Sequence, residues 1–182
     1  VRRPLGYNRR AIQTKWRSML RRIANQSLVY WIAALVILLD QYTKYLVRAS
    51  LAVGEAWAPF PWLEPYARIL HIQNNGAAFG MFRSFGNTFF VSVSIAAIIF
   101  MSWIIVKDKE DHRIFALLAG GAIGNLIDRL ILGYVVDFID VFWRDHHFPA
   151  FNIADSAICI GVGLYVISQA PWKRREDPPA AS

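Results

Sequence analysis

Long apolar stretches alternate with short polar segments along most of the chain. They cover approximately residues 28–47, 87–106, 114–134 and 152–170. Each comes close to the ~20 apolar residues that a transmembrane helix needs. The second is the cleanest, because its run VSVSIAAIIFMSWIIV contains no charged residue. The pattern predicts an all-α integral membrane protein with four transmembrane helices.

The connection between the first two stretches, residues 48–86, has a different pattern. Its segment APFPWLEP is rich in proline and aromatic residues, which suits a turn region at a membrane interface. The next segment, ARILHIQ, alternates in part and predicts a strand, and QNNGAAFG predicts a turn because Asn–Gly readily adopts positive φ. We therefore expect a small extracytoplasmic sheet or flap inserted into the four-helix domain.

Composition supports a membrane protein of one domain. The chain has 182 residues, 55% of them hydrophobic, and a mean hydropathy of +0.31. Its 7 Trp, 7 Tyr and 12 Phe can supply aromatic belts at the two interfaces. We divide the chain into a basic N-terminal extension (1–26), a transmembrane domain (27–171) and a C-terminal tail (172–182). The tail and much of the segment before Ile23 are expected to be disordered.

The net charge of +7 sets the predicted topology. Basic residues without any acid crowd the first 22 positions, and three more follow the last apolar stretch: Arg2, Arg3, Arg9, Arg10, Lys15, Arg17, Arg21, Arg22, Lys173, Arg174 and Arg175. Juxtamembrane cations orient spans and contact anionic lipid more often than they bind nucleic acid. We expect both termini in the cytoplasm and the polar ends of the spans at the extracytoplasmic face.

Five carboxylates lie in or beside the apolar stretches, where a charge is costly and usually functional: Asp40, Asp128, Asp137, Asp140 and Asp155. Asp40 and Lys44 have the i, i+4 spacing of a helical ion pair. Asp128 and Arg129 are interpreted as compensating charges, and Asp140 as an interfacial acid. Asp137 and Asp155 have no evident local cation.

These two unpaired acids follow the third stretch and begin the fourth, so antiparallel neighbours would bring them together. Two carboxylates that share a site hold one proton between them. The ionised acid can then activate water, while the protonated acid polarises a peptide carbonyl. Two alternatives stay open: Asp155 with Asn152 fits a helix capping box, and Asp137 could be an interfacial acid facing water.

Other chemistries are less well supported by the sequence. It contains neither a G-x-S-x-G elbow nor an H-E-x-x-H helix. A pair of Ser156 and Lys44 would leave Asp137 without a role, and His146 and His147 are interpreted as loop residues. Cys159 is expected to be a small buried hydrophobe. We predict no metal and no cofactor.

Small residues of the third stretch have a separate predicted role. Ala116, Gly120 and Gly124 recur at four-residue spacing, which lets membrane helices approach closely.

Five motifs, in order over roughly residues 39–163, resemble those of lipoprotein signal peptidase (signal peptidase II), a family of bacterial membrane aspartic endopeptidases. They are LDQYTK, QNNGAAFG, GGAIGNLIDR, GYVVDFID and FNIADS. The resemblance implies cleavage of diacylglyceryl-modified prolipoproteins before the lipidated cysteine, at the outer face of the bacterial plasma (inner) membrane. It also implies a small extracytoplasmic sheet and a mobile outer helix.

The resemblance places the catalytic pair on Asp137 and Asp155. It places supporting or substrate-binding roles on a further set: Asp40, Lys44, Asn74, Gly76, Asn125, Asp128, Arg129, Asn152 and Ala154. The chain departs from the family in its long Arg-rich extension and in Asn75, where members often carry Thr.

The expected partners are lipid-modified prolipoproteins and membrane lipids, with no nucleic acid, and the expected state is a monomer. The alternative function is a small transporter or proton relay that uses buried acids, and a third is a membrane adaptor with a basic tail. A transporter would distribute its acids through the membrane depth. Here they collect at one end of the predicted spans, which favours the peptidase.

Overall fold

The long apolar stretches form helices in the computed structural model, which describes residues 9–76, 86–107 and 113–169. The helices are α1 (Arg9–Ser50), α2 (Gly86–Lys107), α3 (Arg113–Ile131) and α4 (Ile153–Gln169). The helices α2 and α3 are each long and apolar enough to cross a bilayer, and α4 is a shorter apolar helix of 17 residues. The predicted segments thus agree closely with the helices, apart from the ends of α1 and α3.

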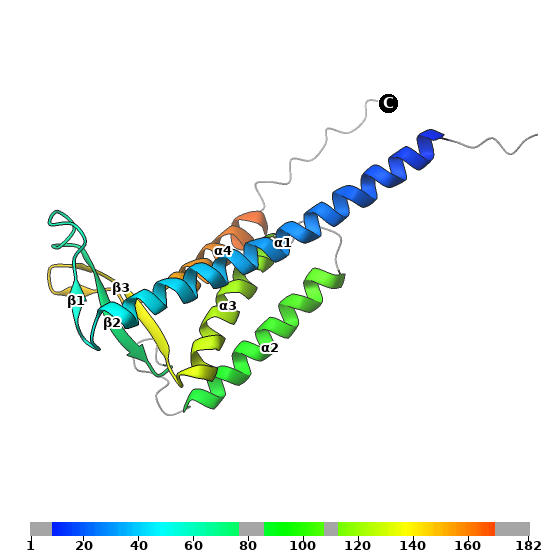
Figure 1. The fold of residues 1–182 in the computed structure, drawn as a ribbon. Coiled ribbons are helices and arrows are strands. Elements are labelled where there is room, and N and C mark those ends of the chain that lie inside the picture. The colour runs from blue at the N-terminus through cyan, green and yellow to red at the C-terminus, as the bar shows by residue number, and fades with distance from the viewer. Residues whose placement is uncertain (1–8, 77–85, 108–112, 170–182) are drawn as a thin grey trace, which may run out of the picture.

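Helix α1 is much longer than the predicted span. It has 42 residues and continues without a break through the expected boundary at residue 26. The prediction of disorder before Ile23 is therefore wrong for residues 9–22, whereas the C-terminal tail lies outside the described residues. In Figure 1 the N-terminal part of α1 extends beyond the other helices, away from the strands.

Helix α3 ends earlier than predicted because the chain turns at Gly133, which has a φ of 83°. A left-handed conformation of this kind is readily adopted by glycine and stops a helix. The segment after the turn, which connects the third and fourth predicted stretches, forms strand β3 (Val135–Trp143), and the sequence pattern predicts no strand there.

Four strands make one antiparallel sheet in the order β1-β2-β3-β4. They are β1 (Ala56–Trp57), β2 (Ala67–Asn74), β3 and β4 (His146–His147). The predicted strand at ARILHIQ is confirmed as β2, but half of the sheet comes from residues after α3. The all-α class is therefore too narrow, and the fold is helices with a small antiparallel sheet, which lies at one end of the helices (Figure 1).

Helix α3 packs against α1, α2 and α4, and its small residues allow this. A side chain on Gly120 would meet the Ala33 carbonyl of α1 at 3.0 Å. On the neighbouring face, a Cβ on Gly121 would overlap the Ala154 carbonyl of α4. The small-residue face predicted for this helix is confirmed as a packing surface.

Strand β3 is attached to the end of α1 by a compact apolar cluster. Val47 from α1 and Val136 and Phe138 from β3 are buried there together. Strand β2 pairs with β3 through Ile72 opposite Asp137 and Arg68 opposite Asp140. This packing fixes where the acids of β3 lie relative to the helices.

Candidate active site

Asp137 is buried at the centre of the region where the sheet meets the helices. Only 2% of its surface is exposed, and both of its carboxylate oxygens accept hydrogen bonds from amides. Asn74 Nδ2 donates to Oδ2 at 2.8 Å, and Asn152 Nδ2 donates to Oδ1 at 2.8 Å. The interpretation of Asp137 as an interfacial acid facing water is therefore wrong.

Asp155 lies in the first turn of α4, where it completes a capping box. Its backbone N–H donates to Asn152 Oδ1 at 2.9 Å, and its Oδ2 accepts the Asn152 backbone N–H at 3.2 Å. The predicted cap is thus present. The other oxygen, Oδ1, accepts Asn125 Nδ2 at 2.8 Å, so the same carboxylate is also held from α3.

Asn152 joins the two carboxylates. It is fully buried, its side chain contacts Asp137, and its backbone contacts Asp155. Its Nδ2 also lies 3.1 Å from Asn125 Oδ1. The structure therefore brings Asp137, Asp155, Asn125 and Asn152 into one hydrogen-bonded group, as the sequence predicted for the two acids.

Burial, followed by the nearby charge of Asp155, raises the pKa of Asp137 to about 7. The hydrogen bonds from Asn74 and Asn152 and the charge of Lys44 offset part of this effect. A carboxyl group with this pKa is partly protonated near neutral pH, unlike an ordinary aspartate. It can therefore donate a proton under conditions where a solvated aspartate cannot.

Lys44 is the centre of a second buried group directly behind the first. Its Nζ lies 2.8 Å from Asp40 Oδ2, 3.1 Å from Asp128 Oδ2 and 2.9 Å from Asn125 Oδ1. The predicted Asp40–Lys44 pair is thus confirmed. Lys44 and Asp40 are both fully buried, which requires this degree of pairing.

Asp128 forms an ion pair with Lys44 at 3.1 Å, a partner that the sequence did not predict, and it also interacts electrostatically with its chain neighbour Arg129, as predicted. Its Oδ2 also accepts the Val136 N–H at 3.0 Å, and Gln41 Nε2 donates to its Oδ1 at 3.0 Å. The pairing with Lys44 is possible because consecutive residues on a helix point in different directions.

Arg129 serves the two acids as well. Its guanidinium interacts electrostatically with Asp155, Asp137 and Asp128, and it lies over the Phe90 ring at 5.4 Å. The sequence suggested that Asp137 and Asp155 have no cation nearby, but in the structure Arg129 interacts with both.

Two other predicted residues support the site through their backbone. The buried Ala154 donates its N–H to Asp40 Oδ1 at 2.9 Å, which ties the start of α4 to α1. Gly76 donates its N–H to Asn74 Oδ1 at 3.0 Å and has a φ of 106°. This turn directs the Asn74 amide toward Asp137. The rest of the QNNGAAFG motif, residues 77–80, lies outside the described residues.

Asp140 has partners that the sequence did not reveal. It is buried, and it pairs with Arg68 Nε at 2.8 Å and with His147 Nδ1 at 2.9 Å. It thereby links β2, β3 and β4 and lies outside the group of Asp137 and Asp155. The only sequence signal was the position of Arg68 within the alternating segment.

Other candidate nucleophiles are engaged or lie elsewhere. Ser156 donates its hydroxyl to the Asn152 carbonyl at 2.9 Å, and Lys44 is held by its two acids. Cys159 is exposed on α4, so its interpretation as a buried residue is wrong. Within the described ranges, His, Cys, Asp and Glu form no group that could hold a metal ion.

Comparisons with known proteins identify relatives of this chain. A family model described as signal peptidase (SPase) II matches residues 32–170. The lipoprotein signal peptidase of Thermodesulfovibrio yellowstonii is 42% identical over 132 residues, which is 72% of this chain and 87% of that protein. That of Serratia marcescens is 40% identical over 148 residues, which is 79% of this chain and 85% of the relative.

Two solved structures, both described as bacterial membrane enzymes, have a similar fold. One has a TM-score of 0.74 at 33% identity and covers 86% of this chain and 95% of its own. The other has a TM-score of 0.70 at 36% identity and covers 80% of this chain and 94% of its own. The match to the family model over most of the chain, and the close relatives, show that this chain belongs to the signal peptidase II family.

Proposed function

We propose that this chain is a membrane aspartic endopeptidase that removes the signal peptide from diacylglyceryl-modified prolipoproteins, cleaving immediately before the lipidated cysteine. The family and the relatives named lipoprotein signal peptidase support the substrate class. The observation that carries the mechanism is the hydrogen-bonded group in which Asn152 contacts both Asp137 and Asp155.

Asp137 is assigned as the proton donor and Asp155 as the base. The raised pKa of Asp137, caused first by burial and then by the charge of Asp155, favours the protonated form there. Asp155 is less deeply buried and lies at the N-terminus of α4, where the helix dipole favours an anion. The two environments therefore separate the roles of two identical side chains.

In the first step Asp155 takes a proton from water as the water oxygen attacks the scissile carbonyl, and Asp137 gives its proton to the carbonyl oxygen. In the second step the proton on Asp155 passes to the leaving amine as the C–N bond breaks. Asp137 regains its proton from a hydroxyl of the intermediate. The cycle ends with both acids in their starting state.

The remaining polar residues position this pair. Asn74, Asn125 and Asn152 hold the carboxylates by their amides. Asp40, Lys44 and Asp128 form a rigid buried group behind them, anchored to α4 through the Ala154 N–H. Arg129 is placed to contact polar groups of the substrate near the scissile bond.

We further propose that all four helices span the bacterial plasma membrane, with both termini in the cytoplasm. The basic residues of the N-terminal extension and tail support this orientation. The acids and the sheet then lie at the extracytoplasmic end, where a protein being translocated emerges. The partners are lipid-modified precursors and membrane lipids, and the active form is a monomer.

A proton relay would need acids spaced along a path through the membrane. The acids of this site instead meet at one place, near the start of α4 and of β3. Asp40 accepts the Ala154 N–H, and Asp155 accepts the Asn152 N–H, both near the start of α4. Asp128 accepts the Val136 N–H at the start of β3. This clustering favours hydrolysis over transport.

Incubation of the purified protein with matched lipid-modified and unmodified precursors tests the proposal. Cleavage of only the lipid-modified form, immediately before the modified cysteine, is expected, and EDTA should leave the rate unchanged. Cleavage of both forms would contradict the proposal that the enzyme acts only on lipid-modified precursors. Inhibition by EDTA that zinc reverses would contradict the two-carboxylate mechanism.

A further inference from the structure

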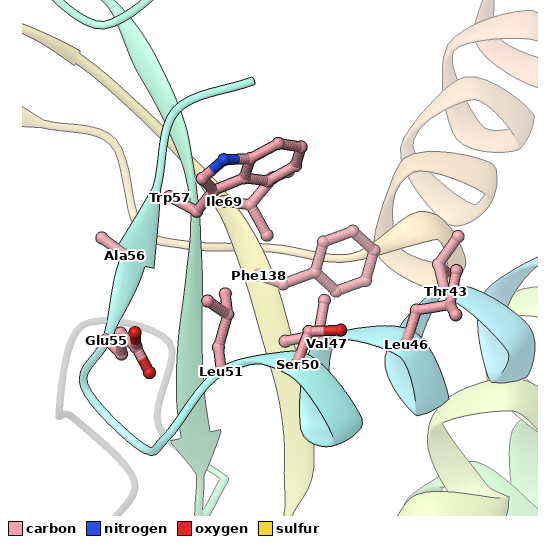
Figure 2. A pocket seen from close by; sticks show the side chains of 10 residues that line it. All are labelled: Thr43, Leu46, Val47, Ser50, Leu51, Glu55, Ala56, Trp57, Ile69 and Phe138. Atoms are coloured by element: carbon pink, nitrogen blue, oxygen red, sulfur yellow. The ribbon is translucent and has the colours of Figure 1, made fainter.

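A pocket of about 670 Å³ lies between the C-terminal end of α1 and the sheet, outside the group of acids (Figure 2). Its walls are mostly apolar and come from α1, the segment after it, β1, β2 and β3. The residues that matter most are Leu46, Val47, Leu51, Trp57, Ile69 and Phe138. Figure 2 shows Trp57 and Ile69 on the strand side and Val47 and Leu46 on the helix side, with Phe138 between them.

This pocket shares its wall with the candidate active site. Phe138 lines it, and Phe138 directly follows Asp137 on β3. Successive side chains of a strand point to opposite faces. The strand therefore presents Asp137 to the hydrogen-bonded acids on one side and Phe138 to the pocket on the other.

Two polar side chains of the pocket, Thr43 and Glu55, are already engaged, and most of the lining is apolar, so its chemistry suits an uncharged apolar ligand. The Glu55 carboxylate accepts the Ala52 N–H at 2.7 Å. The Thr43 hydroxyl donates to backbone carbonyls of its own helix at 2.8 and 2.9 Å. None of the ten lining residues, all within the described ranges, is Lys, Arg or His. An anionic headgroup therefore has no cationic side chain to pair with among these residues.

The mouth of the pocket continues an apolar surface on α1. Leu46, which lines the pocket, is 42% exposed, and Leu39, Tyr42 and Tyr45 on the same helix are exposed as well. Exposed side chains of this kind on a membrane helix face hydrocarbon. A flexible hydrocarbon chain can therefore pass from the bilayer into the pocket without crossing water.

We infer that this pocket holds one acyl chain of the diacylglyceryl group on the substrate cysteine. The inference rests on the proposed function and adds the place where the lipid is recognised. The source is the substrate because its lipid is attached to the residue beside the scissile bond. The scissile bond is proposed to lie at Asp137, and the next residue of the same strand, Phe138, lines the pocket.

The pocket acts by orientation more than by affinity. Moving an acyl chain from lipid to an apolar protein wall exchanges one apolar environment for another, so little hydrophobic free energy is gained. A chain held in the pocket nevertheless fixes the scissile bond relative to the acids, which lowers the entropic part of the barrier. The signature is therefore a dependence of turnover on acyl-chain length.

The first experiment fills the pocket and compares precursors of identical sequence with long and short acyl chains. Leu46→Trp and Ser50→Trp add bulk at lining positions that are exposed, so each should fold. Leu39→Trp is the matched control, with the same bulk on the same helix outside the pocket. The wild type and the control should prefer long chains by about tenfold, and both filled variants should lose that preference.

A second experiment does not depend on turnover. Asp155→Asn protein is mixed with a precursor carrying a photoreactive group at the end of one acyl chain, and the cross-linked peptides are mapped. Cross-links within residues 43–57 or to Phe138 support the inference, and loss of these cross-links when Leu46→Trp is added to the protein strengthens it. Cross-links confined to α2, α3 or α4 overturn it.

Failure of the pocket and failure of the proposed function give different results. If wild-type protein cleaves the lipid-modified precursor but chain-length preference is absent or survives in both filled variants, only the pocket assignment is wrong. An equal loss of rate on all chain lengths would assign the pocket to the peptide and overturn the lipid assignment. If wild-type protein cleaves no precursor, the proposed function fails, and the cross-linking result still decides the pocket.

Discussion

Asn152 donates its side-chain amide to Asp137 across 2.8 Å, although Asp137 lies on β3 and Asn152 immediately before α4. The same asparagine caps α4 and holds Asp155 through its backbone. One residue therefore sets both the start of a helix and the placement of a carboxylate pair. The consequences of this arrangement can be tested individually.

Replacement of either acid of the pair should abolish cleavage. Asp137→Asn and Asp155→Asn each remove an ionisable group while keeping the volume of the side chain, so we expect at least a ~1000-fold loss of kcat with a folded, membrane-inserted protein. Asp145→Asn, an exposed aspartate in the turn between β3 and β4, is the control and should keep full activity. Turnover near the wild-type rate in either pair variant would eliminate the proposed mechanism.

Activity should fall at alkaline pH. The donor role needs Asp137 protonated, and burial together with Asp155 raises its pKa to about 7. The profile of kcat/KM against pH should therefore have a descending limb with an apparent pKa near 7. A profile that stays flat to pH 9, measured on a precursor with no titrating group near the cleavage site, would contradict the assignment.

The same group makes stability depend on pH. Because the pKa of Asp137 in the folded protein exceeds the ordinary aspartate value of 3.8, the folded state binds more protons between these pH values, and stability falls as pH rises from about 4 to 7. The full difference corresponds to at most about 4 kcal/mol above pH 7. Asp137→Asn has no ionisable group at this position and so lacks this pH dependence. The Tm of the variant in detergent, measured relative to the Tm of the wild type, should therefore rise between pH 5 and pH 8. A constant difference would disprove the linkage.

Asn152 can be separated into its two roles. Asn152→Ala removes the cap, which costs about 1 kcal/mol, and also removes the amide that reaches Asp137. Asn152→Ser keeps a cap but not that amide. Both variants should lose about 100-fold in kcat through misplacement of Asp137, whereas only the alanine variant should lose the full stability. Wild-type activity in the serine variant would show that the contact to Asp137 is dispensable.

Lys44 should matter mainly for stability. Lys44→Met leaves the carboxylates of Asp40 and Asp128 buried without their cation, which costs about 3–5 kcal/mol. The double variant Lys44→Met with Asp40→Asn should recover part of that loss, since one uncompensated charge is gone. Thermal unfolding in detergent measures both, and equal Tm values for wild type and Lys44→Met would refute the pairing.

Helix packing can be tested at two glycines. A Cβ on Gly121 would overlap the Ala154 carbonyl and lie 2.7 Å from Ile158 Cγ1, so Gly121→Ala should push α4 away and cost about 1–3 kcal/mol. Gly163→Ala is the control, because nothing lies within 4 Å of its added Cβ. It should be neutral or slightly stabilising by helix propensity. Equal unfolding temperatures for the two variants would argue against this contact.

The sequence by itself determined the features that depend on residues close together in the chain. Apolar runs predicted the helices, the i, i+4 spacing predicted the Asp40–Lys44 pair, and Asn152 with Asp155 predicted the capping box. Each of these follows from the geometry of a single helix, in which residues three or four apart are neighbours. The two acids of the site could be singled out because neither has a basic residue at such a spacing.

Only the tertiary structure decided the partners that lie far apart in the chain. Asp128 forms an ion pair with Lys44 of another helix, and Asp140 pairs with Arg68 of another strand. Strand β3, which carries Asp137 and Phe138, lies after the third predicted stretch and was not predicted as a strand. Such contacts depend on how α3 fits against its neighbours and on the register of β2 with β3. The fit of α3 is set by close packing throughout the molecule. The register matters because a shift of one residue would turn every side chain of the strand to the opposite face of the sheet.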